Sequence, residues 1–133
     1  MRKVIIVGAG GRDFHDFNVL FREDPGTEVV AFTAAQIPGI DDRVYPPALA
    51  GARYPDGIPV HPERELPRLI EELGADEVVF AYSDLPHAEV MHRVSIALAA
   101  GAAVRFDGPR ETMLRSTKPV VAVCAVRTGA GKS

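Results

Sequence analysis

The sequence predicts an α/β protein with a Rossmann-like, doubly wound parallel sheet in three layers. Short β-branched and apolar runs recur along the chain without the polar alternation of a half-exposed strand. Segments with helical periodicity separate these runs. The length of 133 residues leaves room for one complete domain. We therefore expect a Rossmann-like domain over 1–117, followed over 118–133 by the first strand and phosphate-binding loop of a truncated P-loop domain.

Five apolar runs are the predicted strands. The first, residues 4–7, is entirely aliphatic and β-branched, and we expect it at the centre of the sheet with the run at 77–82 beside it. A weaker candidate strand covers 57–60, where Pro59 would restrict it to an edge or to a strand end. The five predicted strands are residues 4–7, 28–33, 77–82, 102–106 and 120–126.

Helical stripes lie between the strands. The apolar residues of 66–73 have the i, i+3, i+4, i+7 spacing of an amphipathic helix, which Gly74 ends. A second stripe runs over 90–98, and three phenylalanines form a weaker one over 14–21. Prolines and glycines crowd residues 37–59, which predicts a long loop without regular elements. Such a loop would either cover a ligand cleft or simply lie on the surface.

Composition excludes several classes of protein. The net charge of −3 and the pI near 5.8 argue against a nucleic-acid surface, which would be basic. The apolar N-terminal run is too short for a signal sequence or a membrane span, so we expect a cytoplasmic protein that does not contact membranes. The single cysteine, Cys124, is expected to be a small buried hydrophobe. The four histidines lack metal-ligand spacing, and the oligomeric state stays open, a homo-oligomer included.

The last eight residues, Val126 to Ser133, resemble a phosphate-binding loop. They follow an apolar run and end in Gly-Lys-Ser, which provides glycine N–H groups for phosphate oxygens, a lysine for the β- and γ-phosphates and a hydroxyl for Mg²⁺. The usual first glycine of the motif is replaced by Val126. We predict Lys132 as the catalytic residue, Ser133 as the Mg²⁺ ligand, and ATP or GTP as the nucleotide. The predicted nucleotide-binding residues are Arg127, Thr128, Gly129, Ala130, Gly131, Lys132 and Ser133.

A second glycine-rich loop follows the first strand. It resembles a dinucleotide fingerprint, but Asp13 occupies the third glycine position, and no acidic residue at the end of the second strand is placed to bind a ribose. Two interpretations remain: the glycines allow close packing, or the free N–H groups of the loop bind an anion with help from Arg12. The predicted substrate-binding residues here are Gly8, Gly10, Gly11, Arg12, Asp13 and His15.

The turn after the run at 77–82 should lie beside this glycine loop. In a doubly wound sheet, ligands bind where the strand order reverses, so Ser83, Asp84 and His87 are also candidate substrate-binding residues. The alternative is that Ser83 or Asp84 only caps the following helix, with Pro86 in its first turn. The expected ligand of this cleft is a small phosphorylated metabolite.

Five stretches, spread over the chain, resemble a known family. They include Gly11-Arg12-Asp13-Phe14-His15 and the run from Ala122 to Gly129, and the others are 32–40, 54–59 and 79–84. At these positions the sequence resembles the cyclic 2,3-diphosphoglycerate synthetases and their bacterial GTPase-like relatives. That resemblance implies a P-loop that tolerates Val126 and a longer protein of which this chain is the N-terminal part.

The resemblance also implies an activity. The expected enzyme is an ATP-dependent ligase that closes an intramolecular phosphoanhydride in 2,3-diphosphoglycerate with Mg²⁺, and the 133 residues alone are expected to be inactive. The alternative is a GTPase-like switch whose Rossmann-like module binds an anionic metabolite. A dehydrogenase or CoA-binding domain fits the fold but not the Gly-Lys-Ser sequence.

Overall fold

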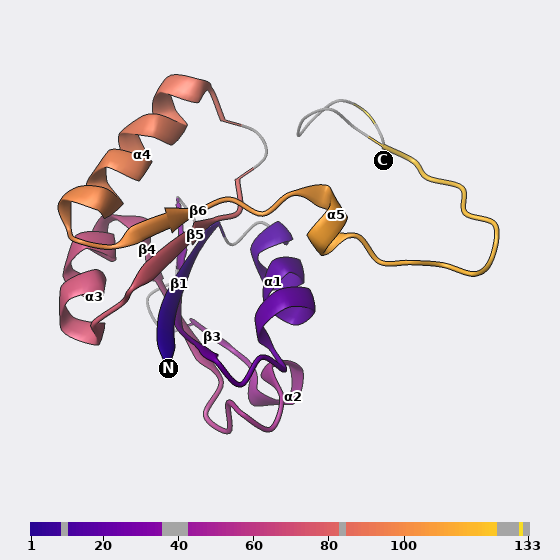
Figure 1. Cartoon of the computed structure of the whole chain (residues 1–133), viewed down its shortest axis with the longest axis horizontal. Coiled ribbons are helices and arrows are strands. Elements are labelled where there is room, and N and C mark those ends of the chain that lie inside the picture. Colours follow the sequence, from indigo (N-terminus) through magenta and orange to yellow (C-terminus); the bar gives the residue numbers. More distant parts are fainter. Residues whose placement is uncertain (9–10, 36–42, 83–84, 125–130, 132–133) are drawn as a thin grey trace.

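The structure is a computed structural model, and it describes residues 1–8, 11–35, 43–82, 85–124 and 131. The chain forms one sheet with helices on both faces, and residues 113–124 extend away from this body (Figure 1). The predicted Rossmann-like, doubly wound, three-layer fold is confirmed.

Six strands form the sheet in the order β3-β4-β2-β1-β5-β6, and only the β3–β4 pair is antiparallel. The first strand, β1, is central and has β5 beside it, which confirms the predicted arrangement. Its aliphatic residues are buried on both faces of the sheet, which is why the strand carries no polar alternation. The strands are β1 (Arg2–Gly8), β2 (Thr27–Ala34), β3 (Arg43–Tyr45), β4 (Ile58–Pro62), β5 (Glu77–Phe80) and β6 (Ala103–Arg105).

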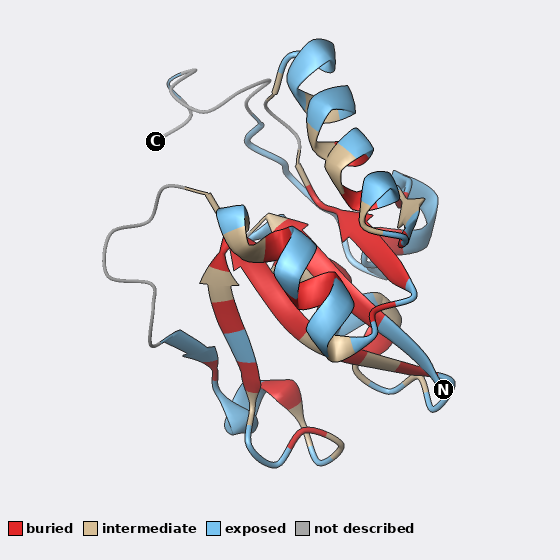
Figure 2. Cartoon of the chain, turned by 90° about the vertical axis from the view of Figure 1, so that its left-hand side faces the viewer, coloured by how far each residue is buried: buried red, intermediate tan, exposed pale blue. Residues whose placement is uncertain are grey.

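The helices divide between the two faces, and the buried centre of the sheet lies between them (Figure 2). One face packs against α1 and the π-helical turn η1 through Phe17 and Phe32, and the other packs against α3 and α4 through Leu69 and Val94. The helices are α1 (Arg12–Asp16), η1 (Phe17–Phe21), α2 (Pro47–Ala50), the 3-10 turn η3 (Glu63–Glu65), α3 (Leu66–Leu73), α4 (His87–Ala99) and α5 (Pro109–Thr112).

The proline-rich stretch 37–59 contains regular structure, which the sequence did not predict. Strand β3 and the single helical turn α2 lie within it. Pro47 is tolerated because it occupies the first turn of α2, where a backbone N–H has no partner inside the helix. Strand β4 lies between β3 and β2, so it is not an edge strand, and Pro59 is its second residue, which agrees with the alternative of a strand end. Pro59 is paired with Val44 of the three-residue edge strand β3.

The predicted strand at 120–126 is not formed in its described part, residues 120–124. These residues are not paired with any described strand, and Val121 is 95% exposed. Cys124 is exposed as well, so the expectation of a buried cysteine was also wrong. The physical reason is that a β-branched run is a stable strand only when a neighbouring strand accepts its hydrogen bonds, and none of the described strands lies beside it.

Candidate functional site

The candidate site lies at the carboxyl end of β1, where the strand order reverses between β2 and β5. Gly8, the last residue of β1, is closely packed: a Cβ at this position would lie 3.3 Å from the Ala81 carbonyl oxygen and 3.3 Å from the Asp13 Cβ. A side chain at position 8 would therefore push the backbone after β5 and the side chain of Asp13 slightly away from β1. This geometry agrees with the close-packing interpretation of the glycine.

Asp13 binds the backbone at the start of α1. It is fully buried, and its Oδ1 accepts a 2.9 Å hydrogen bond from the Gly11 N–H. Gly11 itself has φ +120, a conformation that favours glycine. The Asp13 carboxylate already binds this N–H, which a glycine at position 13 would leave free. The start of α1 is therefore less suited to an anionic ligand.

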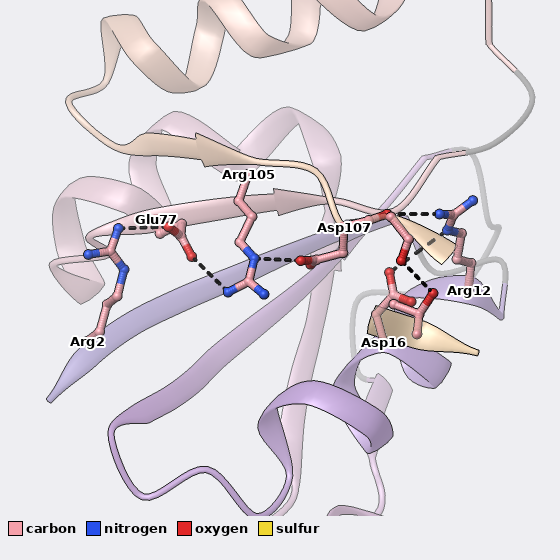
Figure 3. A network of polar contacts seen from close by, with 8 residues as sticks. Arg2, Arg12, Asp16, Glu77, Arg105 and Asp107 are labelled. Atoms are coloured by element: carbon pink, nitrogen blue, oxygen red, sulfur yellow. Dashed lines mark hydrogen bonds and ion pairs between the residues drawn. The ribbon is translucent and has the colours of Figure 1, made fainter. Parts of the chain in front are cut away.

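Arg12 and His15 both bind the segment around α5. The Arg12 guanidinium donates to the Asp107 carbonyl oxygen at 3.2 Å, and its Nε lies 3.9 Å from the Asp16 carboxylate (Figure 3). The His15 Nε2 lies 2.5 Å from the Thr112 carbonyl oxygen, an acceptor, so this ring nitrogen carries the proton. Two side chains predicted to bind substrate therefore have partners inside the chain.

Two further buried carboxyl groups lie beside them, at Asp16 and Asp107. The Asp16 Oδ1 and the Asp107 Oδ2 are buried without a hydrogen-bond partner among the described residues. Burial raises the pKa of Asp16, the neighbouring Arg12 lowers it, and Asp107 adds a further upward effect. The sequence analysis missed both residues. A signal existed for Asp16, because it lies three residues after Asp13 and next to Phe17, on the side of the helix that faces the core.

The Asp16→Asn substitution is expected to stabilise the folded chain at neutral pH, on the order of 1 kcal/mol, because it removes a buried charge. The raised pKa means that the folded state binds this proton more tightly than the unfolded state does. The contribution of Asp16 to stability therefore falls as the pH rises above the unfolded value, about 3.9. Urea unfolding from pH 3 to pH 8 measures the effect.

In these unfolding curves, the stability difference between the Asp16→Asn variant and the wild type should shrink toward acidic pH. The exposed Asp56 provides the control, since Asp56→Asn should leave the pH profile close to that of the wild type. A variant that is less stable than the wild type at neutral pH would show instead that Asp16 is ionised and stabilised by Arg12.

A polar cluster that the sequence analysis did not predict follows β4 and β5. The Arg93 guanidinium donates to the Tyr82 hydroxyl at 3.0 Å and forms an ion pair with Glu63. Burial, and then the nearby Glu63 carboxylate, raises the pKa of the Tyr82 phenol. A neighbouring cavity of about 230 Å³ is lined by Glu63, Arg64, Leu66, His92, Arg93 and Ile96. The two sets of lining residues, 63–66 and 92–96, lie too far apart in the sequence for spacing to connect them.

Several predicted site residues lie outside the described residues: Gly10, Ser83, Asp84, Arg127, Thr128, Gly129, Ala130, Lys132 and Ser133. Their proposed roles stay predictions. His87 is exposed in the first turn of α4, and the N-cap of that helix is Pro86, which has no capping side chain. Gly131 has φ +87, the region that favours glycine and lets a loop turn its N–H groups inward.

The described part of the chain has neither a metal-ligand cluster nor a membrane-spanning helix. No three histidine, cysteine, aspartate or glutamate side chains within it are grouped so that they could hold a metal ion. No helix within it has both the length and the apolar composition needed to cross a bilayer.

Comparison with known proteins relates the chain to an enzyme. No protein-family model matches it. The chain is 59% identical over 132 residues to arginine synthetase ArcE of Thermococcus kodakarensis. The match covers 99% of this chain and 30% of ArcE, so the chain spans less than a third of the length of that relative.

Two solved structures share the fold. UDP-D-quinovosamine 4-dehydrogenase from Vibrio fischeri matches with a TM-score of 0.57 and 20% identity, over 79% of this chain and 76% of that one. RSP, a Rex-family repressor, matches with a TM-score of 0.62 and 15% identity, over 86% of this chain and 49% of that one. At these identities the likeness concerns the fold alone. The chain therefore has a Rossmann-like fold and is homologous to a part of an enzyme, arginine synthetase ArcE.

Proposed function

We propose that this chain is the Rossmann-like part of an ATP-dependent synthetase that forms arginine. The observation that carries the proposal is the 59% identity to arginine synthetase ArcE over 99% of the chain. The expected substrate is then one from which arginine is formed, in place of a phosphorylated metabolite. The nucleotide-dependent ligation that the Gly-Lys-Ser sequence predicts stays part of the expected reaction.

The charges at the carboxyl edge of the sheet support this change of substrate. The Gly11 N–H, Arg12 and His15 were the expected donors to a phosphate, and each has an acceptor within the chain. Buried carboxyl groups lie at the same edge, on Asp13, Asp16 and Asp107. A guanidinium or ammonium group suits such surroundings better than a phosphorylated metabolite does.

The nucleotide would be held by the C-terminal loop. Lys132 would contact the β- and γ-phosphates, and the Ser133 hydroxyl would ligate Mg²⁺. When bound, ATP supplies the phosphoryl group that drives ligation. The left-handed conformation of Gly131 fits a loop of this kind. The missing first glycine, replaced by Val126, agrees with the variant loop of the cyclic 2,3-diphosphoglycerate synthetases that the sequence resembles.

Running the reaction backwards tests the proposal. The full-length protein that carries this chain is incubated with arginine and Mg²⁺, together with ADP and phosphate or with AMP and pyrophosphate. We expect arginine to be consumed and ATP to form in equal amounts, measured by mass spectrometry and a luminescent ATP assay. Replacing ADP by GDP tests the GTPase-like alternative.

A second set of reactions tests the activity that the family resemblance implies. The same protein is given 2,3-diphosphoglycerate, ATP and Mg²⁺, and ³¹P NMR follows formation of the cyclic phosphoanhydride. Arginine-dependent ATP formation without cyclic product supports our proposal. Cyclic product without arginine turnover would contradict it and favour the phosphoglycerate activity.

A further inference from the structure

The cavity of about 230 Å³ lies between η3–α3 and α4, on the face of the sheet opposite to α1. The turn η3 directly follows β4, so the cavity lies toward the carboxyl edge of the sheet, where α/β proteins bind their ligands. Sites that take drug-sized ligands measure roughly 300–1,000 Å³. The size of this cavity therefore restricts its occupant to a small metabolite.

The inner part of the cavity is aliphatic. Leu66, at the start of α3, is 2% exposed and belongs to the core on this face of the sheet. Ile96 lines the other wall from α4 and is half-buried. Each methylene that a ligand buries against such a surface strengthens binding about fourfold. The occupant should therefore have an apolar body.

One charged pair in the wall is already neutralised. The Glu63 carboxylate forms an ion pair with Arg93, and its other oxygen, Oε1, is buried in the protein interior. The Arg93 guanidinium also donates to the Tyr82 hydroxyl at 3.0 Å and lies over the Tyr82 ring, 4.9 Å from its centroid. Three partners thus hold this part of the wall in place, and its two charges cancel.

Arg64 provides the charge that this pair does not cancel. It is exposed, and its guanidinium has no hydrogen-bond or ion-pair partner among the residues that the structure describes. Arg68, one helical turn further along, is paired with both Glu65 and Glu72. The lining residues therefore carry two guanidinium groups and one carboxylate, which favours an anionic group on the ligand.

We propose that the cavity between α3 and α4 binds a small aliphatic carboxylate, whose hydrocarbon body covers Leu66 and Ile96 and whose carboxylate pairs with Arg64. A guanidinium and a carboxylate match in shape, because two parallel N–H groups meet two oxygens. An inorganic anion would leave the aliphatic wall uncovered, and an amine would meet a like charge. The site is separate from the buried carboxyl groups of Asp13 and Asp16, which belong to α1 on the opposite face.

Methyl NMR of the full-length protein that carries this chain locates the binding. Hexanoate is the probe, and the Ile96 δ1 methyl signal is identified as the one that the Ile96→Val variant lacks. We expect this signal to shift saturably with hexanoate, whereas the signal of Ile58, on the opposite face of the sheet, should not move. Hexylamine has the same length and the opposite charge, and should leave the Ile96 signal unchanged. Acetate should bind at least tenfold more weakly than hexanoate, because it lacks the methylenes that cover the wall.

Two matched arginine variants test the charge. Arg64→Gln should raise the Kd for hexanoate about tenfold, as expected when a hydrogen bond to a charged group is lost. Arg68→Gln removes a neighbouring exposed arginine that does not line the cavity, and should keep the wild-type Kd. Both side chains are exposed, so both variants should fold. Isothermal titration calorimetry measures the Kd values.

Three results would overturn the proposal: an Ile96 signal that hexanoate does not shift, equal binding of hexylamine, or equal Kd values for the wild type and Arg64→Gln. A shift of the Ile96 signal in a chain ending at Ser116, but not in the full-length protein, would show that another part of the protein covers the cavity. That result would also overturn it. Neither measurement involves arginine or ATP, so failure of the proposed function is distinguishable from failure of this inference.

Discussion

The Lys132→Ala substitution in the full-length protein is expected to reduce nucleotide-dependent turnover at least a hundredfold. A lysine in this position of a Gly-Lys-Ser loop contacts the β- and γ-phosphates, and removing a group that stabilises developing charge typically costs about 10²- to 10³-fold in kcat. The measurement is the steady-state rate of ATP formation from arginine, ADP and phosphate.

Two controls show whether the loss of turnover is specific to the loop. Lys118→Ala removes another lysine, exposed and outside the loop, and should retain wild-type activity. The thermal unfolding midpoint of Lys132→Ala should equal that of the wild type if the side chain acts on the ligand and not on the fold. Full activity in the Lys132→Ala variant would remove the P-loop assignment.

A second large effect is expected for Gly57→Ala, which should destabilise the chain by about 3 kcal/mol or more. Gly57 has φ +74, a region that disfavours other residues. A Cβ there would clash with the backbone carbonyl oxygen of Tyr45 and lie 2.6 Å from the Val44 Cγ1. Both contacts belong to β3, so the β3–β4 pair should separate. Urea unfolding followed by circular dichroism measures the loss.

Gly26→Ala is the matched control for Gly57→Ala. A Cβ at Gly26 would meet the Asp24 Oδ1 at 3.4 Å, an ordinary contact, and its φ lies outside the left-handed region. The expected change is within about 1 kcal/mol. Equal stability of the two variants would show that β3 can move away from Gly57 without loss.

The sequence predicted those elements whose signal is local. An aliphatic, β-branched β1 indicates a strand buried on both faces, and the apolar spacing of 66–73 indicates one buried helix face whatever the rest of the chain does. Gly74, with φ +65, ends α3 as predicted. The central place of β1, with β5 beside it, followed from these elements because alternating strands and helices have few allowed topologies.

The elements that were missed depend on partners elsewhere in the chain. Strand β3 has three residues and exists because β4 lies beside it. The run at 120–124 has every local feature of a strand, yet none of the described strands pairs with it. Local pattern therefore predicts which residues can form a strand, and only a neighbour decides whether they do.

The sequence analysis placed the candidate site at the carboxyl end of β1, but it could not identify the partners of the side chains there. The carboxyl edge of β1 follows from the topology, and the glycine and aspartate positions follow from the sequence. The acceptors of Arg12 and His15 lie 95 and 97 residues away, at Asp107 and Thr112, which no spacing rule can connect. A basic side chain in a predicted cleft therefore indicates an anion only after its partners within the chain are known.

The exposed run 120–123 also affects how the isolated chain behaves in concentrated solution. Val120, Val121 and Val123 are 71%, 95% and 73% exposed, and no charged residue interrupts the run from Val120 to Cys124. An apolar, β-branched segment with free backbone groups can pair with the same segment of another copy. We therefore expect the 133-residue chain to aggregate at high concentration, whereas a chain ending at Ser116 would lack this apolar segment and remain dispersed.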